Sequence, residues 1–191
     1  MAKSTDYEFQ SLWRVPGTAR EVADVLGDTV TMDRWWPSVY LGIRLVDAGG
    51  EDGLGRVVDL LAKGWLPYTL RWTLTITEPI TREGFAIAAE GDLIGTGRWV
   101  FREEGPETVI SYEWRVSAAK RLLRRLSWLL KPAFAANHRW AMAKGEESLK
   151  LEMRRRRAAD AEQLGRVPAP PGPTFRGTAF RRAVFRAVGR R

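Results

Sequence analysis

Six short segments rich in apolar, aromatic and β-branched residues follow one another between residues 40 and 116. They span residues 40–46, 55–63, 68–76, 84–90, 96–103 and 108–116. The connections between them, for example AGGEDG and TEPITRE, are short and carry Gly, Pro and acidic residues, which are common in turns. Parallel strands need a crossover of about a dozen residues or more, so connections this short indicate hairpins. The pattern therefore predicts a single antiparallel meander.

Several segments place apolar and polar residues on opposite faces. Alternate residues of a strand point to the same side of the sheet. In residues 108–116, polar residues alternate with Ile110, Tyr112, Trp114 and Val116, and residues 7–15 and 68–76 show the same period. We therefore expect a further strand over residues 7–15 and a sheet of about seven strands with one aromatic face.

Helical signals flank the strands. Thr18 followed by Glu21 is the pattern of a capping box, in which each side chain accepts a hydrogen bond from a free backbone N–H. A second short helix is predicted over residues 31–36, just before Pro37, and a long helix over residues 133–155. The apolar stripe of the long helix consists of Phe134, Ala135, His138, Met142, Gly145, Leu149 and Met153.

The long helix can cover the aromatic face of the sheet. At 1.5 Å per residue it is about 35 Å long, whereas an eight-residue strand spans about 27 Å. The element order therefore predicts an α+β fold in two layers, with a curved antiparallel sheet around a long C-terminal helix and two short helices after the first strand. The twist of such a sheet tends to leave a gap between sheet and helix.

The positive charge is concentrated at the C-terminus. The net charge is +8, but residues 154–191 hold eleven Arg against two acidic residues (+9), and residues 1–153 hold twenty basic and twenty-one acidic residues (−1). This distribution argues against nucleic acid as a partner. We expect one domain over residues 5–155, followed by a basic, Pro-containing extension, residues 156–191, that is largely flexible.

Residue counts exclude several kinds of chemistry. The chain has no Cys and a single His, His138, so thiol nucleophiles and Cys- or His-rich metal sites are excluded, and we expect no metal. The stretch GGEDGLG lacks the GK[ST] ending of a phosphate loop, so no nucleotide cofactor is expected. With no signal-peptide apolar region and no apolar run of ~20 residues, the sequence predicts a cytoplasmic protein.

Five stretches carry a family resemblance: RWWP at 34–37, LPYTLRW at 66–72, EGDLIGTGRW at 90–99, YEW at 112–114 and NHRWAMAKGEESL at 137–149. In these stretches and in its element order, the chain resembles the helix-grip superfamily of START-like (SRPBCC) proteins, in particular the polyketide cyclase/dehydrase branch. The resemblance implies a hydrophobic cavity between sheet and long helix that holds lipids, sterols, polyketides or other apolar small molecules. Some relatives cyclise or aromatise a bound chain, whereas many only bind and carry.

The aromatic face and the helix stripe supply the candidate binding residues. Ligand pockets are lined by apolar and aromatic side chains, but the same rings also fill protein cores, so both roles remain open for each ring. The predicted ligand-binding residues are Trp36, Tyr68, Trp72, Trp99, Phe101, Tyr112, Trp114, His138 and Met142, and Trp13 belongs to the same aromatic set.

His138 is the one candidate for a catalytic role. Its ordinary pKa lies near neutrality, so it could draw an acidic proton from a bound β-keto chain or hydrogen-bond a ligand carbonyl. A structural histidine hydrogen-bonded within the core is the alternative.

Gly145, in the middle of the long helix, allows either a close approach of a packing partner or space for a ligand. Trp35 and Trp36 point 100° apart, so we expect one to anchor the short helix and Trp36 to border the cavity entrance.

Residues 120–132, KRLLRRLSWLLKP, combine a leucine face with basic side chains. Such a segment, between Lys120 and Lys131, could lie on an anionic membrane together with the basic tail, or could simply connect the sheet to the long helix.

The function favoured by the sequence is binding of a hydrophobic small molecule, lipid-like or polyketide-like, between sheet and C-terminal helix. The alternatives are a polyketide cyclase/dehydrase-type enzyme that uses His138 and a peripheral-membrane lipid carrier.

Overall fold

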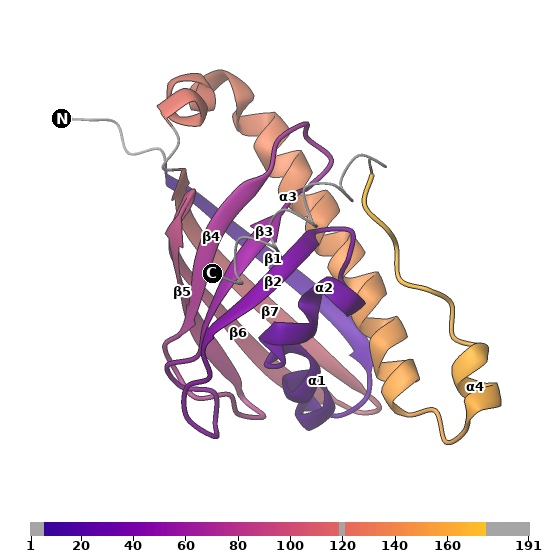
Figure 1. Ribbon diagram of the computed structural model, residues 1–191. Helices are drawn as coiled ribbons and strands as arrows, with labels where there is room; N and C mark the ends of the chain where they lie inside the picture. Colours follow the sequence, from indigo (N-terminus) through magenta and orange to yellow (C-terminus); the bar gives the residue numbers. More distant parts are fainter. Residues whose placement is uncertain (1–5, 119–120, 175–191) are drawn as a thin grey trace.

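One seven-stranded antiparallel sheet forms the body of the molecule. The computed structural model describes residues 6–118 and 121–174, with side chains placed for residues 7–117 and 131–174. The strand order is β1-β7-β6-β5-β4-β3-β2 (Figure 1). The strands are β1 (Asp6–Pro16), β2 (Tyr40–Asp47), β3 (Val57–Ala62), β4 (Leu70–Ile76), β5 (Gly84–Gly91), β6 (Leu93–Glu104) and β7 (Glu107–Ala118). The predicted meander is confirmed, and β1 joins it by pairing along its whole length with β7.

Helices cover one face of this sheet: α1 (Ala19–Leu26), η1 (Thr29–Thr31), α2 (Met32–Trp35) and α3 (Arg121–Arg156). A short last helix, α4 (Ala161–Gly165), follows them in the chain. Figure 1 shows α3 lying across the curved sheet, with α1 and α2 beside the C-terminal half of α3 and α4 beyond its end. The α+β arrangement with a sheet gripping one long helix, and two short helices after the first strand, is as predicted.

The predicted start of the long helix was wrong. Instead of beginning after Pro132, α3 begins at Arg121 and contains Pro132 in its interior. A proline inside a helix removes one backbone hydrogen bond, yet here the chain remains helical on both sides. Residues 120–132 therefore belong almost entirely to α3. The side chains of residues 121–130 lie outside the described residues, so docking on a membrane through this segment stays a prediction.

Two strand boundaries differ from the sequence pattern. β4 begins at Leu70, which leaves Tyr68 in the loop before it. β6 begins at Leu93, where a turn was predicted, because the pairing with β7 continues to Ala118. Asp92 closes the resulting tight hairpin, and its carboxylate accepts a hydrogen bond from the backbone N–H of Arg71 (2.8 Å).

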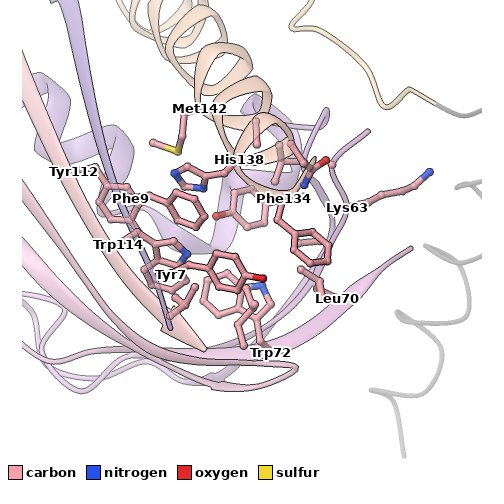
Figure 2. Close-up of a pocket in the computed structure, with 18 of the residues that line it drawn as sticks. Tyr7, Phe9, Lys63, Leu70, Trp72, Tyr112, Trp114, Phe134, His138 and Met142 are labelled. Atoms are coloured by element: carbon pink, nitrogen blue, oxygen red, sulfur yellow. The ribbon is translucent and has the colours of Figure 1, made fainter. Parts of the chain in front are cut away.

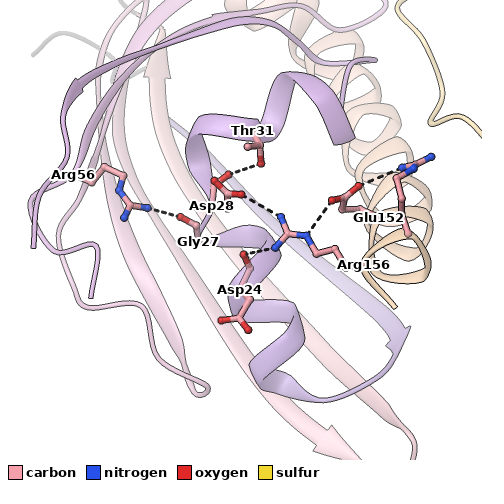
Figure 3. Close-up of polar contacts among 8 residues, drawn as sticks. Asp24, Gly27, Asp28, Thr31, Arg56, Glu152 and Arg156 are labelled. Atoms are coloured by element: carbon pink, nitrogen blue, oxygen red, sulfur yellow. Dashed lines mark hydrogen bonds and ion pairs between the residues drawn. The ribbon is translucent and has the colours of Figure 1, made fainter. Parts of the chain in front are cut away.

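The capping box of α1 is present, and it forms part of a polar junction with the end of α3. The Glu21 side chain accepts a hydrogen bond from the N–H of Thr18 (2.9 Å) and one from Arg157 Nε (2.6 Å). Arg156 donates to the Asp24 carbonyl (3.0 Å) and to the Asp28 carboxylate (3.2 Å), as Figure 3 shows. The C-terminal end of α3 is thus held against α1 by two neighbouring arginines.

The segment after α3 makes few contacts with the rest of the molecule. α4 has no buried residue. Arg155 donates a hydrogen bond to the carbonyl of Pro168 (2.8 Å). The division into a domain and a flexible extension stays a prediction. In residues 6–118 and 121–174, no helix is both long enough and apolar enough to cross a membrane.

Candidate ligand-binding cavity

A cavity of about 170 Å³ lies between the sheet and α3 (Figure 2). Its walls are mainly aromatic and aliphatic, and they come from the strands β1, β2, β3, β4, β6 and β7, the loops around them, and α3. The lining residues are Tyr7, Phe9, Trp36, Val39, Tyr40, Ala62, Lys63, Gly64, Tyr68, Leu70, Trp72, Leu93, Trp99, Tyr112, Trp114, Val116, Phe134, Asn137, His138, Ala141 and Met142.

The apolar face of the sheet lines the cavity at one end and packs into the hydrophobic core at the other. In β7, Tyr112 and Trp114 line the cavity, whereas Ile110 on the same face is 1% exposed and belongs to the core. In β6, Trp99 lines the cavity and Phe101 does not. The boundary falls at the same level in neighbouring strands, so the gap between sheet and helix is open over one part of its length and filled over the rest.

The open side of the cavity lies next to the loop of residues 63–69. Tyr68 in this loop and Phe134 on α3 are partly exposed, while Trp36 and Tyr112 are buried. Figure 2 shows Lys63 and Phe134 at one side of the cavity and Tyr112 at the other. The mouth is therefore between this loop and α3.

Asn137 ties the loop to α3. Its side-chain oxygen accepts a hydrogen bond from the backbone N–H of Leu66 (3.2 Å). A Cβ atom added to Gly64 would lie within 2.6 Å of three atoms of the Asn137 side chain, so the loop backbone rests directly on this residue. Asn137 thus helps to position the loop that borders the mouth, together with the edge-on packing of Tyr68 against Phe134.

His138 reaches from α3 toward β1 and stacks on Phe9. The ring centroids are 4.1 Å apart, with an angle of 16° between the planes. Burial, with a smaller contribution from the positive charge of Arg139, lowers the pKa of His138 to about 4. The imidazole is therefore neutral at pH 7. Its Nε2 atom is buried and has no hydrogen-bond partner in the structure.

The tyrosines of the cavity are also held in their neutral forms. Burial raises the pKa values of Tyr40 and Tyr112, and for Tyr112 the neighbouring Tyr40 adds to the effect. Burial, and to a lesser extent the neighbouring Tyr7, raises the pKa of Tyr68 to about 12. The interior thus disfavours charge throughout, and it suits a neutral ligand better than an ionised one.

Three polar nitrogen atoms of the lining are buried without a hydrogen-bond partner. They are His138 Nε2, Trp36 Nε1 and Trp72 Nε1. A buried donor or acceptor left unpaired costs about 1–3 kcal/mol. Side chains of the cavity wall thus carry unpaired polar atoms just beneath an otherwise apolar surface.

The fold has counterparts among solved structures. A protein from Thermus thermophilus aligns with TM-score 0.63 at 16% identity, over 80% of this chain and 100% of that one. The Zhui aromatase/cyclase from a Streptomyces species aligns with TM-score 0.63 at 15% identity, over 81% and 97%. A START superfamily protein from Mycobacterium smegmatis gives 0.51 at 15% identity, over 71% and 98%. This chain has the START-like helix-grip fold. No family model and no curated protein sequence matches it.

The helix-grip fold brings most of the predicted binding residues to one place. Eight of the nine line the cavity: Trp36, Tyr68, Trp72, Trp99, Tyr112, Trp114, His138 and Met142. The ninth, Phe101, packs against Phe85 (ring centroids 6.2 Å apart) in the core. Trp13 lies in the core as well, between Trp36 and Trp99. Whether the eight contact a ligand stays a prediction.

Several lining residues were missed by the sequence analysis. Tyr7 and Phe9 alternate with Trp13 on the predicted first strand, and that alternation was the available signal. Val39, Tyr40 and Lys63 stand at strand ends, where the pattern does not distinguish inward from outward positions. Asn137 precedes His138 on α3, and only the position of the loop reveals its role.

Trp35 and Trp36 take different places, but Trp36 is not at the entrance. Trp35 is 1% exposed and does not line the cavity. Trp36 lines the cavity at its buried end, where its indole lies against Gly145 of α3. For Gly145 the sequence left two roles open, close packing of a partner or space for a ligand. The structure shows close packing, because the Trp36 indole fills the space beside the Gly145 backbone.

Proposed function

We propose that this protein binds a neutral, largely apolar small molecule in the cavity between the sheet and α3. The observation that carries this proposal is the aromatic cavity, in which three lining residues, His138, Trp36 and Trp72, also hold a buried nitrogen without a hydrogen-bond partner. A ligand with one or two oxygen atoms would pair with such a nitrogen once a small shift of the side chain exposes it, while the apolar part of the ligand fills the remaining space.

The volume limits what fits. An apolar protein cavity of about 150 Å³ is known to hold benzene. The cavity here is of similar size, about 170 Å³, and opens toward the loop of residues 63–69. We infer that one ring or a short chain segment occupies the interior and that any longer part of the ligand extends through the mouth.

Fluorescence titration with N-phenyl-1-naphthylamine, a neutral apolar probe, tests the proposal, and native mass spectrometry of the purified protein looks for a ligand already bound. We expect saturable probe binding that is displaced by small neutral alcohols and ketones. Trp72→Phe keeps the ring and removes the donor, so it should weaken binding of ketones more than of hydrocarbons of equal size. Absence of saturable binding in the folded protein would contradict the proposal.

A second candidate is catalysis on a polyketide-like chain, with His138 as the polar group. It is favoured by the unpaired Nε2 of His138 and by the aromatase/cyclase among the structures with this fold. With its pKa lowered to about 4, the neutral imidazole is a weak base and is better suited to donating a hydrogen bond to a carbonyl. Incubation with a linear poly-β-ketone thioester, with His138→Gln as the control, distinguishes the candidates: an enzyme forms product, whereas a binding protein is only saturated.

A further inference from the structure

The cavity stops where Trp36 meets α3. Along α3, Phe134, His138 and Met142 line the cavity at successive turns. At the next turn stands Gly145, and a Cβ atom added to it would lie within 2.7 Å of three atoms of the Trp36 indole. Beyond this point Leu149 is fully buried in the core. The Trp36 ring therefore separates the cavity from the packed part of the interior.

Two further tryptophans extend this wall across the sheet. The ring of Trp13 lies edge-on to Trp36, with centroids 5.6 Å apart, and its centroid is 5.4 Å from that of Trp99. Of these three, Trp36 and Trp99 face the cavity, and Trp13 lies behind them. The wall thus runs from α3 to β6.

The backbone of Trp36 is held in place from both sides. Its N–H donates to the carbonyl of Met32 (2.8 Å), and its own carbonyl accepts hydrogen bonds from the N–H groups of Val39 (3.2 Å) and Tyr40 (3.0 Å). The rings of Trp13, Trp35 and Tyr40 also pack against the indole, with centroids 5.3–5.6 Å from its own. If the space at Gly145 were filled, the ring would have to move, and the cavity is the open space next to it.

We propose that Trp36, seated against the bare backbone of Gly145, sets the length of the ligand that the cavity accepts. This inference rests on the proposed function, since it concerns the same cavity. Glycine is unfavourable inside a helix relative to alanine, and here it provides the room for an indole that no other residue would leave. Trp36 is accordingly a specificity-determining residue, and Gly145 a positioning residue that acts through it.

A chain-length series of 1-alkanols, displacing N-phenyl-1-naphthylamine from the full-length protein, measures the limit directly. Affinity should rise about fourfold per methylene while the added carbon still enters the cavity, and it should stop rising at the length that reaches the wall. We expect Gly145→Ala to shift this limit to shorter alkanols and Trp36→Ala to shift it to longer ones. In Gly145→Ala combined with Trp36→Phe, the smaller ring leaves room for the methyl group, so the limit should return toward that of the natural chain.

Phe101→Leu is the matched control, because it removes volume behind the wall and should leave the limit unchanged. Circular dichroism establishes that each variant is folded. If Gly145→Ala does not fold, Trp36→Ala and Trp36→Phe decide alone, through a shift to longer chains. The inference is overturned if affinity stops rising at the same alkanol length in all folded variants. It is also overturned if Phe101→Leu shifts this length as much as Trp36→Ala does. Failure of the natural chain to bind any alkanol or the probe would instead overturn the proposed function.

Discussion

His138 occupies a position that opposes its own protonation. It stacks on Phe9 within an aromatic cavity, and its pKa falls to about 4 because the charged form would be poorly solvated there. In the unfolded chain the pKa returns to an ordinary value near 6.5. Below that value the unfolded state takes up a proton that the folded state does not, so stability is full above about pH 6.5 and declines as the pH falls toward 4.

We therefore predict that the purified, ligand-free protein is less stable at pH 5 than at pH 7.5 by about 2 kcal/mol, as measured by urea unfolding. Because His138 is the single histidine, His138→Gln should remove most of this dependence. An equal pH dependence in the variant and in the natural chain would show that His138 is not the cause.

The loop of residues 63–69 shows how one contact between elements bears on function. It borders the mouth, and two contacts tie it to α3: Asn137 accepts a hydrogen bond from Leu66 and lies against Gly64, and the Tyr68 ring packs edge-on against Phe134, with centroids 6.2 Å apart. Loops held by few contacts open at low free-energy cost. Exchange of ligand should therefore depend on this tie more strongly than affinity does.

For Asn137→Ala we expect dissociation of N-phenyl-1-naphthylamine to become several-fold faster, with a smaller change in the equilibrium constant, because release and capture both accelerate. Stopped-flow fluorescence measures both rates. Lys144→Ala, which alters α3 on the side that pairs with Glu147, is the matched control and should leave the rates unchanged. Equal dissociation rates in Asn137→Ala and in the natural chain would mean that the loop is held by other contacts.

The capping box of α1 offers a second test between elements. Thr18→Ala removes the hydroxyl that accepts a hydrogen bond from the N–H of Glu21 (3.2 Å), and it should cost about 1 kcal/mol of unfolding free energy. Glu21→Gln keeps a side chain that can cap the helix but loses the ion pair with Arg157, which is partly exposed, so its cost should be smaller. Thermal unfolding measures both variants, and a larger loss of unfolding free energy in Glu21→Gln than in Thr18→Ala would contradict this ranking.

The same carboxylate adds a dependence on acid. Hydrogen bonds from Arg157 and Thr18 lower the pKa of Glu21 to about 2. A lowered carboxylate pKa gives stability that is present above about pH 4.5 and is lost as the pH falls toward 2. Measurements of unfolding free energy between those pH values should show a smaller loss in Glu21→Gln than in the natural chain, because other paired carboxylates, such as Glu83, still titrate there.

At the scale of the whole molecule, the contacts of α3 with α1 extend to Arg156 and Arg157. A chain that ends at Arg157 should therefore keep the melting temperature and probe binding of the full chain. A chain that ends at Arg155 should melt about 2–4 °C lower, since it lacks both arginines. Differential scanning calorimetry of the three chains tests this, and a full-length chain markedly more stable than both shortened ones would assign a structural role to the extension.

The sequence by itself determined the sheet, its antiparallel order and the stripe of α3. These depend on local patterns: period-2 alternation, short turns and the spacing of apolar residues along a helix. The continuation of α3 before Pro132 was missed because a proline is a local break signal, whereas the described helix continues through it. Patterns of this kind reveal which face of an element is buried, but not what that face is buried against.

Only the tertiary structure decided which buried residues form a cavity and which form a core. Trp99 and Phe101 are two residues apart on one face of β6, yet one lines the cavity and the other packs on Phe85. The difference arises from where α3, the short helices and the indole of Trp36 meet the sheet. Burial is a property that a strand pattern encodes, whereas empty space is a property of several elements together, and it depends here on the absence of a side chain at Gly145.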